Sequence, residues 1–420
     1  MTAAETCAPV EVSRQRILYV LSCWPHDQAY GGQIRALQVA RALARKGKVT
    51  LAIVGADPVL ESVKVRTAEE FDLAGEWPVQ STGIHGLGAL IRSLFAPEFV
   101  NIHGVALDEA SEKHILALMK SDADLVWFFQ LRTANYFMTA NWPDAVVDVD
   151  NLPSASATST GEGTSLSVSR LAARLRTWQL RRHERRLAKR FGVVAVCSDA
   201  DRRTLGADGR LLVIPNGFDM PVVETARAPS NPPRIGFIGL LEYEPNRDGV
   251  RWFLAHCWPA LRQAVPGIRL RLAGKGGGRV VNGSVDGVDI LGWIDDAGAE
   301  MATWSLTVIP IFSGAGTRIK VAEAFSRRCP VVATPLGAYG YEVEDGRELR
   351  LGDTPEAFVS ACLDLLRDPV AAAAMTARAW EAYVENWSWD AVAPRVWEAV
   401  EEAFRHRRSR GAESVMTDRS

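Results

Sequence analysis

Short apolar runs alternate with stretches of helical spacing along most of the chain. In the first half the apolar runs are residues 17–21, 49–54, 125–129, 145–149 and 193–197. A segment that begins at Gly31-Gly32 separates the first two runs and carries apolar residues at helical spacing. Continuous apolar runs are typical of strands that are buried on both faces of a parallel sheet. The pattern therefore predicts a doubly wound, Rossmann-like α/β domain over residues 14–215.

The same alternation resumes in the second half of the chain. Its apolar runs are residues 234–239, 268–273, 288–291, 306–312 and 330–333, and residues 248–264 have helical spacing. The pattern breaks at residues 215–219, and residues 226–233 are polar and rich in proline, which places the domain boundary there. We expect a second Rossmann-like domain over residues 233–386, facing the first across a cleft at the carboxyl edges of the two sheets.

Three segments fall outside this alternation. Residues 387–405 are predicted to form a C-terminal helix that packs back on the first domain, and residues 406–420 a disordered tail. Residues 154–169 are rich in Ser, Thr and Gly, which indicates a mobile loop.

Composition limits the classes of function. The chain has 420 residues, of which 47% are apolar and 23% charged, and a formal net charge of -2, so no global charge favours nucleic acid. The six cysteines are scattered without metal-like spacing. Residues 1–12 lack the apolar core of a signal peptide, and no apolar run approaches the ~20 residues that span a bilayer. We expect a cytoplasmic protein.

The segment from Arg170 to Phe191 is strongly basic. It holds eight arginines and one lysine against the single acidic residue Glu184, and it has a partial apolar face that includes Trp178. One interpretation is a solvated helix that packs one stripe on the first domain. The other is a peripheral contact with anionic lipid headgroups at the inner membrane face.

The candidate chemistry begins with a glycine-rich turn between an apolar run and a helix. Gly314, Ala315, Gly316 and Thr317 form this turn, and the helix follows. Glycines allow close approach of the backbone, and free amides at a helix start favour an anion. Three charged residues follow: Arg318, Lys320 and Glu323. Amides and cations for phosphate, with a carboxylate for hydroxyls, suit a nucleotide-sugar.

Four phrases in order carry a family resemblance: residues 214–219, 238–246, 292–294 and 316–324. They resemble the group 1 (family four) retaining glycosyltransferases of GT-B fold, over about residues 14–400. The resemblance implies a nucleoside-diphosphate sugar as donor, held mainly by the second domain. It also implies that Glu323 contacts the donor ribose and that Arg318 and Lys320 contact the diphosphate. The alternatives are a Glu323–Lys320 pair and ordinary surface charge on the helix.

The chain departs from the family pattern at two places. Ala315 stands where many members carry a glutamate that contacts the donor sugar. Leu240 and Asn246 stand near the places of a usual arginine and lysine. The phosphate contacts would therefore shift to Arg318, Lys320 and the backbone amides.

Further candidates lie at the ends of other predicted strands. On the donor side these are Gly31, Gly32, Gly239, Trp293 and Ile294, and on the acceptor side His26, Asp27, Asp148 and Asp150. Each has an alternative interpretation: the glycines would serve only to form tight turns, Trp293 would be buried against the next helix, and His26 would be a structural residue. The parallel-sheet context favours cleft lining or capping over metal binding for the two aspartates.

The expected function is transfer of a hexosyl group from a nucleoside-diphosphate sugar to a hydroxyl acceptor, with retention. The acceptor would be a polysaccharide, a lipid-linked glycan or a small molecule, and no metal or cofactor is expected. A nucleotide-sugar epimerase of GT-B fold and a catalytically silent binding subunit remain open. An NAD-linked oxidoreductase is disfavoured because no Gly-x-Gly-x-x-Gly opens either domain.

Overall fold

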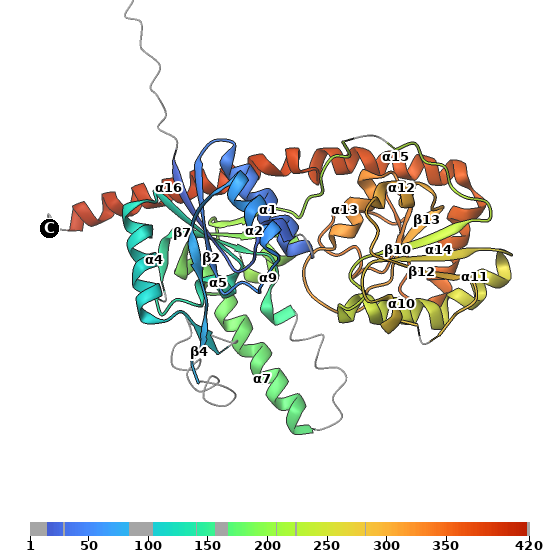
Figure 1. The fold of residues 1–420 in the computed structure, drawn as a ribbon, viewed down its shortest axis with the longest axis horizontal. Helices are drawn as coiled ribbons and strands as arrows, with labels where there is room; N and C mark the ends of the chain where they lie inside the picture. The colour runs from blue at the N-terminus through green and yellow to red at the C-terminus, as the bar shows by residue number, and fades with distance from the viewer. Residues whose placement is uncertain are drawn as a thin grey trace, which may run out of the picture.

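The computed structural model of the chain describes residues 15–27, 30–83, 104–139, 141–155, 167–206, 208–222, 225–281 and 283–417. The N-terminus of residues 1–12 and most of the predicted loop at residues 154–169 lie outside the described residues. Two α/β domains stand side by side, and the last two helices, α15 (Pro369–Asn386) and α16 (Trp389–Thr417), run along the second and the first domain respectively (Figure 1). No helix among the described residues is long and apolar enough to cross a membrane.

The first domain is built on a seven-stranded parallel sheet with the order β3-β2-β1-β6-β7-β8-β9. Its strands are β1 (Arg16–Leu21), β2 (Lys48–Val54), β3 (Asp72–Trp77), β6 (Leu125–Phe129), β7 (Trp142–Val149), β8 (Phe191–Val196) and β9 (Leu211–Val213). Its helices are η1 (Pro25–Asp27), α1 (Gly31–Ala44), α2 (Glu61–Glu70), α4 (Glu109–Ser121), α5 (Leu131–Ala134), α7 (Ser167–Glu184), α8 (Leu187–Arg190) and α9 (Asp199–Leu205), with a small antiparallel pair β4 (Gln80–Ser81) and β5 (Val105–Ala106). Buried clusters cover both sheet faces, as expected for apolar strands.

The second domain has a six-stranded parallel sheet with the order β12-β11-β10-β13-β14-β15. Its strands are β10 (Arg234–Ile238), β11 (Arg269–Ala273), β12 (Val288–Gly292), β13 (Leu306–Ile309), β14 (Val331–Ala333) and β15 (Arg350–Leu351). Its helices are α10 (Glu244–His256), α11 (Trp258–Ala264), η2 (Gly277–Arg279), α12 (Ala297–Ala302), α13 (Ile319–Ser326), α14 (Pro355–Arg367) and α15 (Pro369–Asn386). Both sheets therefore reverse their strand order beside their first strand, and ligands of such sheets bind outside that point.

Two predicted elements of the second domain differ in extent. The helix expected at residues 248–264 is two helices, α10 and α11, because Pro259 in the first turn of α11 cannot continue the hydrogen bonding of α10. The strand expected at residues 306–312 ends at Ile309, and Pro310, which has no amide hydrogen, follows.

Helix α16 (Trp389–Thr417) returns to the first domain after α15. Val392, Val396 and Val400 are fully buried in the same core cluster as β1, β2 and α1. The structure differs from the predicted tail, because the helix extends through Thr417 instead of ending near residue 405. Each residue that prolongs an existing helix needs no new nucleation, so a polar sequence rich in Arg, Ala and Glu continues it. Residues 418–420 lie outside the described residues.

Candidate active site

The N-termini of α1 and α13 meet at the boundary between the two domains. A β-carbon on Gly31, the first residue of α1, would lie 2.9 Å from Cδ1 of Ile319, the first residue of α13. Helix α1 follows β1, and α13 follows β13. Each of these strands lies where its sheet reverses the strand order, between β1 and β6 in the first sheet and between β10 and β13 in the second, so each helix start lies at a switch point. The two helix starts, with their free amides, therefore face one boundary.

The glycine-rich turn before α13 lies against the first domain. Gly314 and Gly316 have φ of 93° and 77°, which favours glycine. A β-carbon on Gly316 would lie 1.6 Å from Oδ1 of Asn151, so no side chain fits there without movement. The predicted loop thus contacts the end of β7 across the boundary.

Arg318 is engaged by its own turn. Its Nη1 donates to the carbonyl of Gly316 at 2.6 Å and its Nη2 to that of Ser313 at 3.2 Å. The Arg318 side chain is buried, and burial lowers its pKa. Its Nε has no hydrogen-bond partner among the described residues. Arg318 therefore holds the turn together, and a phosphate would have to share the guanidinium with the loop carbonyls.

Lys320 occupies the position beside the end of β10. Its Nζ donates to Oδ1 of Asn246 at 2.7 Å and lies 4.6 Å from the centroid of the Phe237 ring. A β-carbon on Gly239 would lie 3.1 Å from that Nζ, so the glycine leaves room for the cation. Burial, with a smaller effect of Arg318, lowers the pKa of Lys320 to about 7. A nearby anion would favour the charged form of this lysine.

Glu323 is the carboxylate of α13. Its Oε1 lies 3.6 Å from Nη2 of Arg327, one helical turn later, and its side chain is 15% exposed. The alternative of a Glu323–Lys320 ion pair is therefore not what the structure shows. Burial raises the pKa of Glu323, and the charges of Arg327 and Lys320 oppose that shift.

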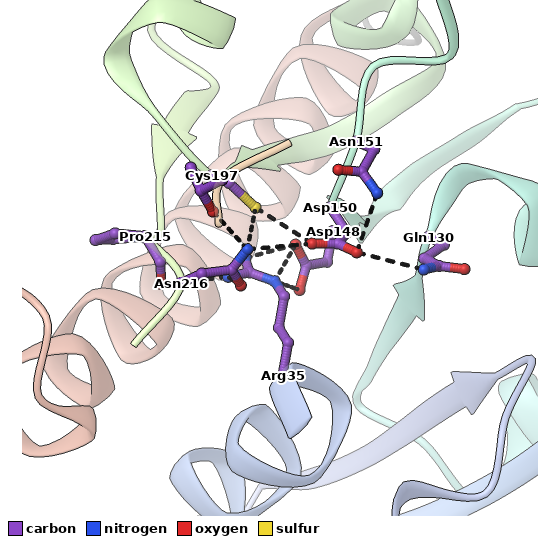
Figure 2. A network of polar contacts seen from close by, with 9 residues as sticks. Arg35, Gln130, Asp148, Asp150, Asn151, Cys197, Pro215 and Asn216 are labelled. Carbon is purple, nitrogen blue, oxygen red and sulfur yellow. Dashed lines mark hydrogen bonds and ion pairs between the residues drawn. The ribbon is translucent and has the colours of Figure 1, made fainter. Parts of the chain in front are cut away.

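Asp148 belongs to the core of the first domain rather than to the acceptor side. It is fully buried, and Nη2 and Nε of the equally buried Arg35 bond its carboxylate at 2.7 Å and 3.0 Å (Figure 2). The contacts that the structure gives Asp148 are therefore those of a buried ion pair within the first domain. Alternation does place Asp148 and Asp150 on one side of β7. Asp148, however, lies two residues before Asp150, inside the strand and beneath α1, whereas Asp150 follows the end of the strand.

Asp150 lies at the end of β7, where the side chains of Gln130, Asn151, Cys197 and Asn216 meet it. Its Oδ2 accepts from Nε2 of Gln130 at 3.5 Å and from Nδ2 of Asn151 at 3.4 Å (Figure 2). A β-carbon on Gly32 would lie 3.4 Å from the same oxygen. Asp150, Gly32 and the end of β6 are thus brought together at the carboxyl edge of the sheet.

Sequence reasoning missed Gln130. It follows β6 directly and has φ of 64° and ψ of 142°, which is rare for a residue with a side chain. Backbone strain of this kind costs of order 1–3 kcal/mol and concentrates at functional sites. No apolar pattern signals such a conformation. The one signal in the sequence that could have found this residue is its position directly after the predicted strand at residues 125–129.

His26 contacts helix α2 of its own domain. Its Nδ1 lies 3.1 Å from Oγ1 of Thr67 and its Nε2 lies 2.9 Å from Glu70, both on α2. His26 is buried and has both ring nitrogens engaged, which is the structural role named as the alternative to an acceptor contact. Asp27 is exposed and accepts from Nε2 of Gln33 at 2.8 Å.

Trp293 stands on the surface at the end of β12. It is 63% exposed, which removes the burial alternative, and its Nε1 donates to Asp295 at 3.2 Å. The ammonium of Lys275 lies 5.3 Å from the centroid of its ring. Ile294, by contrast, is partly buried against the core of the second domain.

Two direct hydrogen bonds join the domains near the glycine turn. Nδ2 of Asn216 donates to Oγ1 of Thr317 at 2.7 Å, and the hydroxyl of Tyr339 donates to Asp201 at 2.9 Å. The first bond holds the turn against the segment that follows β9, and the second joins α9 to the segment that follows β14.

The described residues contain no group of three or more His, Cys, Asp or Glu placed to hold a metal ion. Two cavities lie elsewhere: one of about 740 Å³ beside Gln15 and Phe404, and one of about 800 Å³ between the connecting segment at Arg227 and Ser305 of the second domain. Neither is lined by a predicted site residue.

Known proteins share this architecture. The structure of sucrose-phosphate synthase from Thermosynechococcus elongatus is 16% identical with a TM-score of 0.62, and the match covers 93% of this chain and 100% of that chain. Anabaena Alr3699/HepE in complex with UDP and glucose is 15% identical with a TM-score of 0.59, over 92% of this chain and 100% of that chain. WaaG, a glycosyltransferase involved in lipopolysaccharide biosynthesis, is 15% identical with a TM-score of 0.59, over 90% and 98% of the two chains.

Likeness at such identities establishes the fold alone. No curated protein matches the sequence of the chain significantly. The family model of group 1 glycosyl transferases matches residues 232–368, which are most of the second domain. The chain therefore has the GT-B fold of these glycosyltransferases, and its second domain matches group 1 of the glycosyl transferases.

Proposed function

We propose that the protein is a retaining glycosyltransferase of group 1, family four, that moves a hexosyl group from a nucleoside-diphosphate sugar to a hydroxyl acceptor. The observation that carries this proposal is the meeting of two helix starts, at Gly31 and Ile319, across the boundary of a GT-B fold. Their amides offer hydrogen bonds to one anionic group from both domains at once.

The second domain supplies the donor contacts in this proposal. Amides of the turn at residues 314–317 bind the diphosphate, with Lys320 as its nearest cation. Glu323 accepts hydrogen bonds from the ribose hydroxyls, and Trp293 flanks the base. The HepE structures hold UDP or UDP-glucose, which makes a UDP-sugar the first donor to test.

The reaction needs stabilisation of the negative charge that develops on the leaving diphosphate. Amides and a cation that are already oriented supply it without reorganisation, and closure of the domains excludes water from the sugar. The ionised diphosphate accepts the proton of the acceptor hydroxyl as the new glycosidic bond forms. Gly31 and Gly32 offer their amides to the donor from the first domain, and Asp150, beside Gly32, lies on the side where the acceptor binds.

The basic helix α7 adds a second part to the proposal, a peripheral contact with anionic lipid at the inner face of a membrane. In Figure 1 this helix extends away from the body of the first domain. Its exposed side chains include Arg174, Leu175, Arg176 and Trp178. Cations around a tryptophan suit the interface of an anionic bilayer.

The test is to incubate the protein with a panel of nucleoside-diphosphate sugars and hydroxyl acceptors, and to measure release of the nucleoside diphosphate. Formation of a glycoside with the donor's anomeric configuration, read by proton NMR, would support retaining transfer. A changed sugar without acceptor would indicate an epimerase, and binding without turnover a silent subunit. Either result would overturn the proposed activity.

A further inference from the structure

Asn216 is buried in the segment that connects the two domains, between β9 and β10, which we call the crossover, and it contacts both domains. Its side chain is 3% exposed and bonds Arg35 and Asp150 of the first domain and Thr317 of the second. We propose that Asn216 is a positioning residue that orients the Thr317 hydroxyl toward the donor diphosphate. This inference rests on the proposed function.

The orientation of the Asn216 amide is fixed by Arg35. Nη1 of Arg35 lies 3.0 Å from Oδ1 of Asn216 and 3.3 Å from the carbonyl of Pro215. A guanidinium only donates, so the amide must present its oxygen to Arg35. Arg35 cannot turn away, because its other nitrogens hold Asp148 (Figure 2).

The amide nitrogen of Asn216 is consequently directed at the other side of the network. It donates one hydrogen to Oγ1 of Thr317 at 2.7 Å, and its other hydrogen is shared between Oδ1 of Asp150 at 3.3 Å and Sγ of Cys197 at 3.6 Å. A threonine hydroxyl that accepts from an amide keeps its own proton for another acceptor. Among the described residues, none accepts that proton.

The free donor of Thr317 lies within the turn that carries Gly314 and Gly316. An ionised diphosphate offers only acceptors, so it matches a hydroxyl held as a donor. The direction of the hydroxyl depends on Asn216, which belongs to the crossover, and so on the contact between the domains. The diphosphate contact is therefore complete only when the first domain lies against the turn.

The experiment compares Thr317→Val, Thr317→Ser, Asn216→Ala and the double variant Asn216→Ala/Thr317→Val. Calorimetry measures binding of UDP, GDP and ADP, and of the nucleoside that matches the diphosphate bound best. Thr317→Val should weaken the diphosphate roughly ten- to hundredfold, as expected for a hydrogen bond to a charged group, and leave the nucleoside unchanged. Thr317→Ser should keep the wild-type affinity.

Asn216→Ala should also weaken the diphosphate selectively, but it should have no further effect when Thr317 is already Val. Equal losses for diphosphate and nucleoside, or additive losses in the double variant, would overturn the inference. Should Asn216→Ala fail to fold, Thr317→Val alone decides, since an unchanged affinity for the diphosphate refutes the contact. A wild-type protein that turns over a donor while these variants bind normally refutes this inference only. A wild type that binds no nucleoside diphosphate refutes the proposed function with it.

Discussion

Gly316 of the second domain lies directly against Asn151 of the first, so that a β-carbon on Gly316 would be 1.6 Å from Oδ1 of Asn151. The same glycine has φ of 77°, a conformation that other residues adopt at a cost. The turn that we assign to the diphosphate is therefore shaped by its contact with the partner domain as well as by its own backbone.

Gly316→Ala should weaken nucleoside-diphosphate binding at least tenfold, because both the turn and its contact with Asn151 must change. Gly209→Ala is the matched control, since no atom lies within 4 Å of a β-carbon at Gly209. Calorimetry with UDP measures both. Similar affinities in the two variants would contradict the close fit at Gly316.

The buried pair of Arg35 and Asp148 makes a prediction about stability. Asp148→Asn leaves a buried guanidinium without its counter-charge and should lower the free energy of unfolding by about 3–5 kcal/mol. Asp124→Asn, which breaks the exposed pair with Arg16, should cost less than about 1 kcal/mol. Urea denaturation followed by circular dichroism compares the two. Equal losses would argue against the structural role of Asp148.

Glu323 is assigned to the donor ribose, and the ligand can test this directly. Wild-type protein should prefer UDP over 2′,3′-dideoxy-UDP, and Glu323→Gln should lose roughly ten- to hundredfold in UDP affinity and most of that preference. Arg327→Gln removes the ion-pair partner of Glu323 and should retain the preference. A preference that survives Glu323→Gln would place the ribose elsewhere.

Lys320 predicts a pH dependence of binding. Its pKa of about 7 lies below its ordinary value of 10.5, so above pH 7 the free protein holds it mostly neutral. A bound diphosphate favours the charged form and raises that pKa, so binding takes up a proton and UDP affinity falls as the pH rises above 7. Calorimetry in buffers of different ionisation enthalpy measures the uptake.

Lys320→Met should abolish the proton uptake that this lysine provides. Lys275→Met removes the same charge at an exposed lysine and should leave the uptake in place. Binding without proton uptake by the wild type at pH 8 would contradict the assignment of Lys320 to the diphosphate.

Helix α7 predicts binding to anionic vesicles. Reversing the charge of Arg174, Arg176 and Arg181 should reduce co-sedimentation with phosphatidylglycerol vesicles at least tenfold, because each surface cation contributes about 1 kcal/mol. The control reverses three exposed arginines elsewhere, Arg66, Arg203 and Arg367. Equal binding of both variants, or wild-type binding to phosphatidylcholine alone, would contradict the proposed contact.

Local patterns predicted the central strands and the glycine turn. Burial of a strand on both faces produces a continuous apolar run, and a turn with positive φ favours glycine, so both are visible in a short stretch of sequence. Strand β3 was missed, since it lies at the sheet edge and Asp72, Gly75 and Glu76 interrupt any apolar run. The extension of α16 was missed because its polar sequence resembles a tail and propagates from a packed helix.

The candidate site was predictable only where its residues are close in sequence. The turn and Glu323 belong to one motif, whereas Asn216 and Thr317 are 101 residues apart. His26 was assigned to the cleft because its partner Glu70, 44 residues later, could not be foreseen. Contacts of this kind depend on how the elements pack, which apolar spacing does not encode.

Two separate segments of the chain build the first domain: its N-terminal part and the C-terminal helix α16. During synthesis, the sheet that begins with β1 must wait for Val392, Val396 and Val400 before that side of its core is covered. The second domain, whose buried clusters end at Trp387, has all its parts before α16 emerges. The second domain is thus complete before the first, so that a chain cut short before α16 would carry a complete second domain and a first domain with one side of its core uncovered.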